Sequence, residues 1–329
     1  MNFRDLAIAL EVFDIDRLDC DQRSYMCSDV DELSYGMSVD RFVFGQTMDV
    51  ICRENIKKRF VVRKPEKRKF KNKVIAVDLG GSSLKMCFWI RENGEFHVKE
   101  TVIKQLDDFY DLTASEFIDK EIKWFLLGLG VTMEECDYTL SFSYRFETIT
   151  DDTIKVMCSS KKWQFSKLNP LLTFKTPFCC ILNDVTALMI SAYKDNSINL
   201  AFISGTGFNA AISTGEEIFV TEMGQETVSD ISVDEILGGM STYKNTGCNM
   251  PVAKDDPISE IRILIKRRLL TFLIKYFIDL YRDDGRRINI VLNGTCFIKH
   301  PTIIEEVRNE CDISKVEDAT ISFFKNISI

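Results

Sequence analysis

Residues 74–87 read VIAVDLGGSSLKMC, and this stretch decides the fold of the region around it. The apolar, β-branched run at 74–77 predicts a buried strand, and the alternating apolar residues over 84–88 predict a second strand. A pair of glycines lies between the two segments, and glycine can turn the chain through positive φ angles at little cost. We therefore expect a β-hairpin whose glycine turn lies at the end of a buried strand.

The turn also carries the residue types of a phosphate site. Glycines have no side chains, so backbone N–H groups in the turn can approach an anion closely, and two serine hydroxyls follow them. A carboxylate at the strand end is compatible with a bound phosphate when a cation such as Mg²⁺ lies between them. The alternative is an ordinary hairpin with a glycine turn, and this segment alone leaves both interpretations open. The candidate residues are Asp78, which is also the candidate metal ligand, and Gly80, Gly81, Ser82, Ser83 and Lys85.

Composition restricts the class of protein. The chain has 329 residues, which exceeds the usual size of one core, and 45% of them are hydrophobic. This length and composition fit either one compact globular body or the two lobes of an α/β enzyme. The net charge of −8 gives no support to a nucleic-acid partner. The chain has only two histidines, which argues against a histidine metal site and a Ser-His relay. Its eleven cysteines are scattered and include no CxxC pair, which argues against a disulfide framework. No apolar stretch reaches the ~18 to 20 residues of a membrane span, and the acidic N-terminus is unlike a signal peptide, so we expect a cytoplasmic protein.

The order of apolar and polar segments predicts an α/β protein with three regions. Residues 1–73 are expected to form an N-terminal helical region and, at 57–73, a basic connector that is more often a solvated segment than a binding arm. Residues 74–185 are expected to form a small lobe, and residues 186–329 a large lobe.

Local signals predict further elements within these regions. Asn93-Gly94 predicts a second hairpin turn. Ser115 predicts the N-cap of an amphipathic helix that ends at Gly128 or Gly130. The segments YTLSFSY, FCCIL and NLAFIS predict strands, and a helix is expected over 185–194 between the last two.

Two more candidate sites lie at strand ends. Asn183-Asp184 follows an apolar strand at the mouth of the next helix, where ligands bind in open α/β sheets. An amide and a carboxylate can grip sugar hydroxyls, and the carboxylate can accept a hydroxyl proton; the alternative is that Asp184 only caps the helix. Farther along, strand 200–203 runs into Gly205-Thr206-Gly207 with Asn209 after it, which repeats the glycine hairpin. Two such turns in one chain favour a nucleotide site.

Six segments resemble, in order, the motifs of the hexokinase family within the actin-like ATPase superfamily. They are DLGGSSLK (78–85, similar to DLGGTNFR), LSFSY (140–144, similar to FTFSY), LNDV (182–185, similar to NDT), SGTGFNA (204–210, similar to GTGCNA), TEMG (221–224, similar to TEWG) and LNGTCFIKHP (292–301, similar to DGSVYKKHP). The resemblance implies a two-lobed actin-like ATPase fold, which is ribonuclease-H-like and of the hexokinase type. It also implies an ATP-dependent kinase that phosphorylates a sugar in glycolysis.

The resemblance assigns roles to individual residues. Asp184 would take the proton from the 6-hydroxyl of a hexose, expected to be glucose, and Asp78 would lie near Mg²⁺. The sugar-binding residues that the resemblance implies are Ser143, Asn183, Asn209, Glu222 and Asp234. The residues that it implies for ATP are Asp78, Gly80, Gly81, Ser82, Ser83, Lys85, Gly205, Thr206, Gly207, Gly294 and Thr295.

The chain departs from the family pattern in several places. WQFSK at 163–167 stands where the family has WTKGF, which alters the sugar contacts at Gln164 and Phe165. DATISFF at 318–324 stands where the family has DGSGKGAAL near the adenosine, and the segment between Met240 and Val291 is shorter than in the family. Two classes of function therefore stay open: an active hexose kinase, and a catalytically inactive hexokinase-like protein that senses sugar or docks to a partner.

Overall fold

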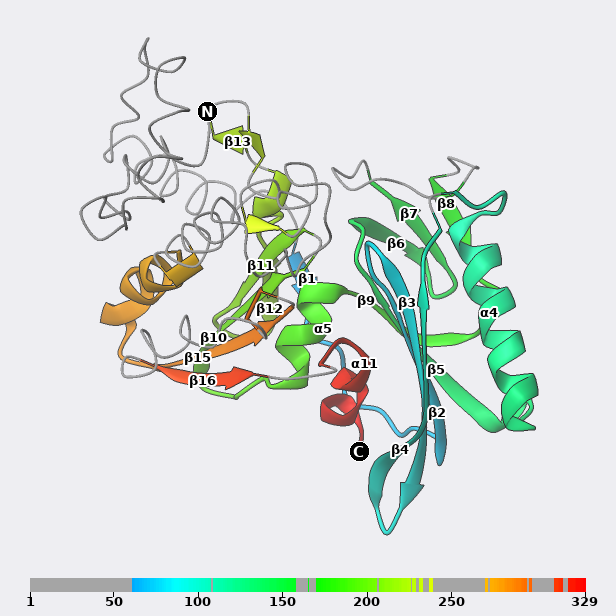
Figure 1. Ribbon diagram of the computed structural model, residues 1–329. Coiled ribbons are helices and arrows are strands. Elements are labelled where there is room, and N and C mark those ends of the chain that lie inside the picture. The colour runs from blue at the N-terminus through cyan, green and yellow to red at the C-terminus, as the bar shows by residue number, and fades with distance from the viewer. Residues whose placement is uncertain are drawn as a thin grey trace, which may run out of the picture. The chain divides into compact units, whose positions relative to one another are not determined.

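The protein forms two compact units (Figure 1). The computed structural model describes residues 61–157 except 108, then 165, 170–238 with gaps at 206, 226, 229–230 and 233–236, 270–297 except 272 and 295, and 311–329 except 316–318. Unit 1 comprises the chain up to residue 62 together with 195–314, and unit 2 comprises 63–194 together with 315–329. The α/β class expected from the sequence is confirmed, whereas the helices expected before residue 61 lie outside the described residues.

Unit 2 is built on a five-stranded sheet in the order β4-β3-β2-β5-β9. The first three strands form an antiparallel meander, and β5 and β9 extend it in parallel with β2. Both predicted hairpins are confirmed, since the Gly80 N–H donates to the Ser83 carbonyl at 2.8 Å in the first turn and Asn93 and Gly94 take positive φ angles in the second. The strands are β2 (Lys73–Leu79), β3 (Ser83–Glu92), β4 (Glu95–Gln105), β5 (Cys136–Phe142) and β9 (Phe178–Asn183).

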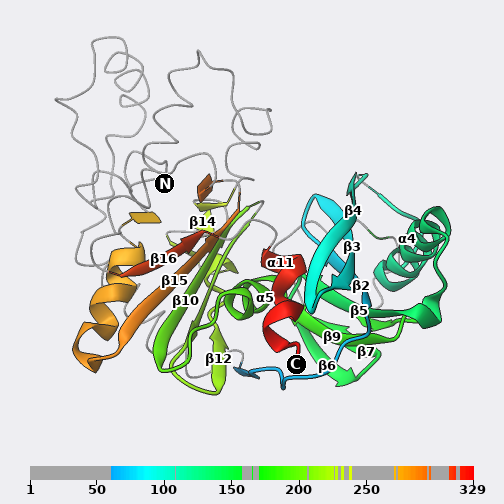
Figure 2. The same ribbon diagram turned by 90° about the horizontal axis from the view of Figure 1, so that it is seen from below.

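Helix α4 (Ala114–Leu129) covers one face of this sheet (Figures 1 and 2). The helix ends at Gly130 with φ 64°, as predicted, but the predicted cap at Ser115 is wrong. Thr113 is the N-cap, because its hydroxyl accepts from the Glu116 N–H while the Glu116 carboxylate accepts from the Thr113 N–H, and this reciprocal pair satisfies two free donors. Below the helix, alternate residues of β2 join the same core: Ile75, Val77 and Leu79 pack with Phe117, Ile118 and Ile122.

The opposite face of the sheet carries α5 (Asp184–Ser191), α11 (Ala319–Ser322) and the 3₁₀ turn η5 (Phe323–Ile327), as Figure 2 shows from below. Phe324 is fully buried there, and its ring lies edge-on to those of Phe70, Trp89 and Phe96 with centroids 5.1–5.6 Å apart. A smaller sheet in the order β6-β7-β8 completes unit 2, with β6 (Phe146–Thr150), β7 (Thr153–Val156) and β8 (Leu171–Thr173). The end of the chain is thus part of the core of unit 2.

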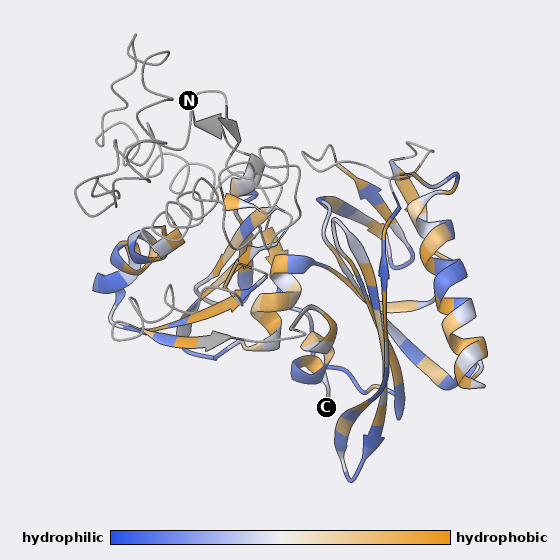
Figure 3. Ribbon diagram, viewed as in Figure 1, coloured by the Kyte–Doolittle hydropathy of each residue, from blue (hydrophilic) through white to orange (hydrophobic). Residues whose placement is uncertain are grey.

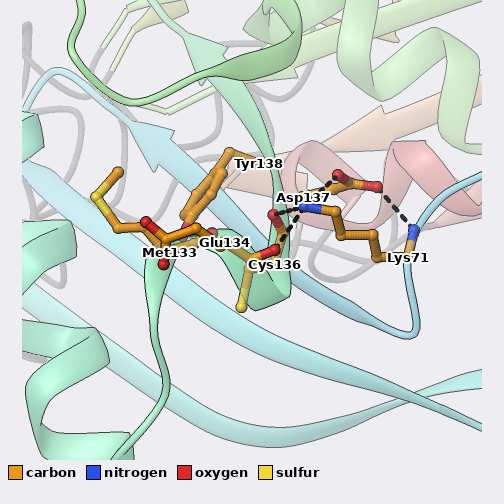
Figure 4. Close-up of polar contacts among 6 residues, drawn as sticks. All are labelled: Lys71, Met133, Glu134, Cys136, Asp137 and Tyr138. Carbon is orange, nitrogen blue, oxygen red and sulfur yellow. Dashed lines mark hydrogen bonds and ion pairs between the residues drawn. The ribbon is translucent and has the colours of Figure 1, made fainter.

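The described part of the basic run is attached to unit 2. Lys71 donates its backbone N–H to Asp137 Oδ2 at 2.7 Å and its ammonium group to the carbonyls of Glu134 and Cys136 at 2.7 and 3.1 Å (Figure 4). Arg68 donates its N–H to the Ile327 carbonyl at 2.7 Å. Both residues are exposed, as expected for a solvated segment, and their hydrogen bonds also attach the segment to the start of β5 and to η5.

Unit 1 repeats the arrangement of the first sheet. Its six-stranded sheet has the order β1-β12-β11-β10-β15-β16, in which β10 pairs antiparallel with β11 and parallel with β15. At the centre, Asn289 donates its amide to Asn199 Oδ1 at 2.8 Å between two fully buried side chains, which fixes the register of β10 and β15. The strands are β1 (Val61–Arg63), β10 (Ser197–Ser204), β11 (Phe208–Ser213), β12 (Glu217–Val220), β15 (Arg287–Asn293) and β16 (Asp312–Lys315).

Residues 273–281 are helical, and the other described elements are short. A two-stranded ribbon joins β13 (Thr227–Val228) to β14 (Ile231–Ser232), and the 3₁₀ turns are η2 (Met133–Glu135), η3 (Met223–Gln225) and η4 (Arg282–Asp284). Figure 3 shows the apolar residues gathered along β10, β15 and α5, whereas the tip of the β3–β4 hairpin is hydrophilic. None of the helices among the described residues is both long and apolar enough to span a membrane.

We expect Phe324→Ala to destabilise unit 2 by about 3–5 kcal/mol, because it removes a fully buried ring from between three others. Urea unfolding followed by far-UV circular dichroism measures the loss. The control is Phe109→Ala, whose side chain is 65% exposed and should change the free energy of unfolding by less than about 0.5 kcal/mol. Equal effects of the two substitutions would contradict the packing described here.

Candidate active site

Asp78 lies at the end of β2 on the sheet face that carries α11. Its neighbours in β2, Val77 and Leu79, point to the core under α4, so the period of two directs the Asp78 carboxylate to the opposite face. Thr320 of α11 donates its hydroxyl to Asp78 Oδ2 at 3.0 Å. Lys85 is the cross-strand partner of Asp78 on β3. The carboxylate therefore has a hydroxyl donor and a cation beside it.

The environment of Asp78 raises the pKa of its carboxyl group to about 6. Burial is the main cause, since it disfavours the charged form. The negative charge of Asp184 raises the pKa further, whereas the hydroxyls of Ser141 and Thr320 and the ammonium group of Lys85 lower it. Two carboxylates therefore share one partly desolvated region, and a divalent cation bound there would offset the cost of keeping both ionised.

Asp184 is the first residue of α5, and Asn183 is the residue that caps this helix. The Asn183 side chain accepts from the Val185 N–H at 3.2 Å and donates to the Phe142 carbonyl at 3.4 Å. The alternative in which Asp184 serves as the N-cap is therefore wrong. Asp184 is buried, and its Oδ1 accepts from the Val185 N–H at 2.8 Å. The backbone at the start of α5 therefore orients the Asp184 carboxylate.

The first glycine turn is tight, and its backbone is largely paired. Besides the bond from Gly80 to Ser83, the Leu106 N–H donates to the Ser82 carbonyl at 2.9 Å. A side chain on Gly80 would have its Cβ only 3.3 Å from the Ser83 carbonyl oxygen. Ser143 lies just after β5, the strand next to β2. Its N–H donates to the Leu79 carbonyl at 3.0 Å, and its side chain is buried. The turn and Ser143 thus lie beside the end of β2.

The second glycine turn has an equivalent position in unit 1. The Gly205 N–H donates to the Gly207 carbonyl at 3.0 Å between β10 and β11. Gly294, directly after β15, has φ 106°, and a Cβ there would lie 2.4 Å from the Ser204 carbonyl oxygen. Only glycine fits such a close approach at this φ angle, so the ends of β10 and β15 are packed backbone to backbone.

Asn209 and Glu222 form a polar pair on the same unit. The Asn209 amide donates to Glu222 Oε1 at 3.1 Å, and the Glu222 side chain is 6% exposed. Glu222 has φ 48°, a left-handed conformation that costs energy for a residue with a side chain. The preceding residue fixes this turn, because the N–H and hydroxyl of Thr221 both donate to the Ala210 carbonyl at 2.9 Å.

The predicted site residues therefore fall into two sets. One set lies at the strand ends of unit 2 and the other at the strand ends of unit 1. Thr206, Asp234 and Thr295, together with Gln164, lie outside the described residues. Phe165 is buried against Tyr110 and Phe117. The first set comprises Asp78, Gly80, Gly81, Ser82, Ser83, Lys85, Ser143, Asn183 and Asp184, and the second comprises Gly205, Gly207, Asn209, Glu222 and Gly294.

Sequence reasoning missed Ser141 and Thr320, the two hydroxyls beside Asp78. Ser141 is the register partner of Asp78 on β5, which follows only once the two strands are known to pair in parallel. Thr320 is 242 residues away along the chain, and no local pattern connects it to β2.

Solved structures resemble this chain over almost its whole length. The hexokinase from Schistosoma mansoni complexed with glucose matches with a TM-score of 0.59 over 99% of this chain and 98% of that one, at 13% identity. Another hexokinase structure matches with a TM-score of 0.58 over 98% of each chain, at 10% identity. The chain has the hexokinase fold. The expected actin-like architecture is thereby confirmed.

A hexokinase fold is also related to that of ROK-family sugar kinases. The ROK-family glucokinase from Streptomyces griseus, in complex with glucose and AMPPNP, matches with a TM-score of 0.51 and 12% identity over 78% of this chain and 97% of that one. No protein-family model matches the sequence, and no curated protein matches it either. At these identities the likeness establishes the fold, and the activity is a separate question.

We expect Gly294→Ala to cost about 2–4 kcal/mol, because the added Cβ would collide with the Ser204 carbonyl at a positive φ angle. Thermal unfolding measures the change. Gly215→Ala is the matched control, since nothing lies within 4 Å of its added Cβ, and it should change the stability by less than about 1 kcal/mol. A Gly294→Ala protein as stable as the control would show that the backbone contact is absent in solution.

We expect Asp78→Asn to stabilise the protein at pH 8 by up to roughly 3 kcal/mol, with the gain shrinking as the pH falls through 6 toward 4. The sign follows because the folded-state pKa is above 3.8: the native protein binds a proton that the unfolded chain releases, so ionisation of Asp78 weakens the fold at high pH. Urea unfolding without metal at pH 4.5, 6 and 8 measures this dependence.

The control for this pH series is Asp152→Asn. Hydrogen bonds from Thr150 and Thr153 hold the pKa of the exposed Asp152 carboxyl below its usual value, so its replacement should give no gain at pH 8. A pH-independent effect of Asp78→Asn would contradict the raised pKa.

Proposed function

We propose that this protein is an ATP-dependent sugar kinase that phosphorylates a hexose, with glucose as the expected substrate, at its 6-hydroxyl. The observation that carries the proposal is the pair of carboxylates on unit 2. Asp78 lies near the end of β2 and Asp184 directly follows β9 of the same sheet, Asp184 is buried, and its negative charge raises the pKa of Asp78. Such a pair costs stability and is typical of a site that binds a cation or moves a proton.

Asp184 is the candidate base because LNDV at 182–185 resembles the hexokinase motif whose aspartate takes the hydroxyl proton. It is buried at the start of α5, where Asn183 is the N-cap and Asp184 Oδ1 accepts from the Val185 N–H. In the proposed reaction, the 6-hydroxyl oxygen forms a bond to the γ-phosphorus of ATP as the bond to the bridging oxygen of ADP breaks. Asp184 accepts the hydroxyl proton, and ADP leaves with the negative charge. Ser143, Asn183, Asn209, Glu222 and Asp234 are proposed to bind the sugar.

The donors on unit 2 suit a phosphate with a hard cation. Asp78 offers carboxylate oxygens, and its raised pKa shows that an added positive charge would stabilise the ionised form. Lys85, across the hairpin from Asp78, adds a fixed positive charge. When bound, Mg²⁺ would neutralise phosphate charge during transfer. The glycine turns at 80–83 and 205–207 are proposed to bind phosphate oxygens through backbone N–H groups, and Gly294 with Thr295 to lie at the nucleoside.

The second candidate is a sugar-binding protein without catalytic activity. One observation favours it: the bulky residues Ile321, Phe323 and Phe324 stand in the segment where the family is rich in glycine. Such a protein would retain sugar binding while lacking phosphoryl transfer.

A coupled hexose-6-phosphate assay with ATP and Mg²⁺ tests the proposal. We expect glucose-dependent turnover by the wild type and a loss of at least about 10²-fold in Asp184→Ala, because the base is removed. Asp137→Ala is the control, since this carboxylate lies at the other end of β5 and binds Lys71. The activity of this variant should fall only as far as its folded fraction falls. Absence of turnover in the wild type, with glucose still raising the melting temperature, would overturn the kinase in favour of the sugar-binding protein.

A further inference from the structure

The C-terminal segment contributes a side chain to the Asp78 site, although it is far from β2 in the sequence. The Thr320 hydroxyl lies 3.0 Å from Asp78 Oδ2, and α11 packs on both β2 and α5. An ionised carboxylate has no proton to donate, so the hydroxyl is the donor and its single proton is committed to Oδ2. The bond is therefore charge-assisted, and it restricts the rotation of the Asp78 side chain.

The segment that carries Thr320 is fastened on several sides. Asn326 donates its amide to the Ile190 carbonyl of α5 at 2.9 Å, and Arg91 of β3 donates to the Ser328 hydroxyl at 2.8 Å. The Ile329 N–H donates to the Arg68 carbonyl at 3.0 Å. Together with the buried ring of Phe324, these contacts hold the residues after Thr320 in one place.

A rigid support of this kind is what a metal-binding carboxylate requires. Ligating carboxylates are themselves hydrogen-bonded in metal sites, and those outer partners orient the ligand. Thr320 has that relation to Asp78, because it fixes one carboxylate oxygen without neutralising the charge. Ser141 is the second hydroxyl beside the carboxylate, and it comes from β5.

We propose that Thr320 is a positioning residue, which holds Asp78 in the orientation that binds the metal of a metal–nucleotide complex. The inference rests on the proposed function, because it takes Asp78 as a metal ligand. It assigns no contact between Thr320 and substrate. Its consequence is that α11, far from β2 in the sequence, determines the metal affinity of a site formed on β2.

The test measures metal binding directly in the full-length protein. Mn²⁺ with ADP is titrated into the protein and free Mn²⁺ is followed by electron paramagnetic resonance. We expect Thr320→Val, which keeps the shape but removes the donor, to weaken Mn²⁺ binding by about 10- to 100-fold. Thr320→Ser retains the hydroxyl and should restore the wild-type affinity. Melting temperatures identify any variant that fails to fold.

Thr139→Val is the matched control. Thr139 is fully buried on β5, on the same sheet face as Ser141, and its hydroxyl makes no hydrogen bond among the described residues. The control should bind Mn²⁺ as the wild type does. Unchanged affinity in Thr320→Val, an equal loss in Thr139→Val, or no Mn²⁺ binding by the wild type would each overturn the inference.

Failure of the inference and failure of the proposed function give different results. A wild type that binds Mn²⁺ with ADP but phosphorylates no hexose, together with weakened binding in Thr320→Val, would refute the kinase and support the positioning role. A wild type that phosphorylates glucose, with Thr320→Val unchanged in metal affinity, would support the kinase and refute the positioning role.

Discussion

The site on unit 2 depends on the desolvated carboxylate of Asp78. A strand that ends in a charged residue among buried neighbours is unfavourable by itself, since burial disfavours ionisation and Asp184 adds a like charge. The surrounding residues offset part of the cost of ionising Asp78. Thr320 donates its hydroxyl to the carboxylate, and the nearby Ser141 hydroxyl and Lys85 ammonium group also lower the pKa, but the pKa of Asp78 remains raised. A cation bound at the end of β2 would therefore stabilise the ionised form of Asp78.

The same arrangement of strands occurs in both units and explains where the candidate residues lie. In each sheet an antiparallel pair joined by a glycine turn is followed by a parallel neighbour: β2 and β3 with β5 in unit 2, and β10 and β11 with β15 in unit 1. The parallel neighbour ends beside the turn. In unit 2 it delivers Ser143, and in unit 1 it delivers Gly294, whose lack of a side chain allows backbone contact with Ser204.

Local patterns in the sequence were sufficient for the hairpins and strand ends, because those features depend on neighbouring residues. The glycine turn after Asp78 and the turn at Asn93-Gly94 are examples. The cap of α4 also has a local signal, since Thr113 and Glu116 have the spacing of a capping box; the nearby Ser115 is a competing cap residue and misled the prediction. The contact of Thr320 with Asp78 had no local signal, because it depends on the tertiary path of the chain after β16.

The packing of the C-terminal segment gives a structural reason for its departure from the hexokinase motif. Ile321, Phe323 and Phe324 are fully buried in unit 2, and burial of each such side chain contributes about 1.5–3 kcal/mol. Glycines at those positions would supply none of this energy. Phe324 contacts the rings of Phe70, Trp89 and Phe96, all of which belong to unit 2. The bulky residues therefore stabilise the segment that holds Thr320 against Asp78, and their presence is explained by this packing without invoking the loss of a nucleotide site.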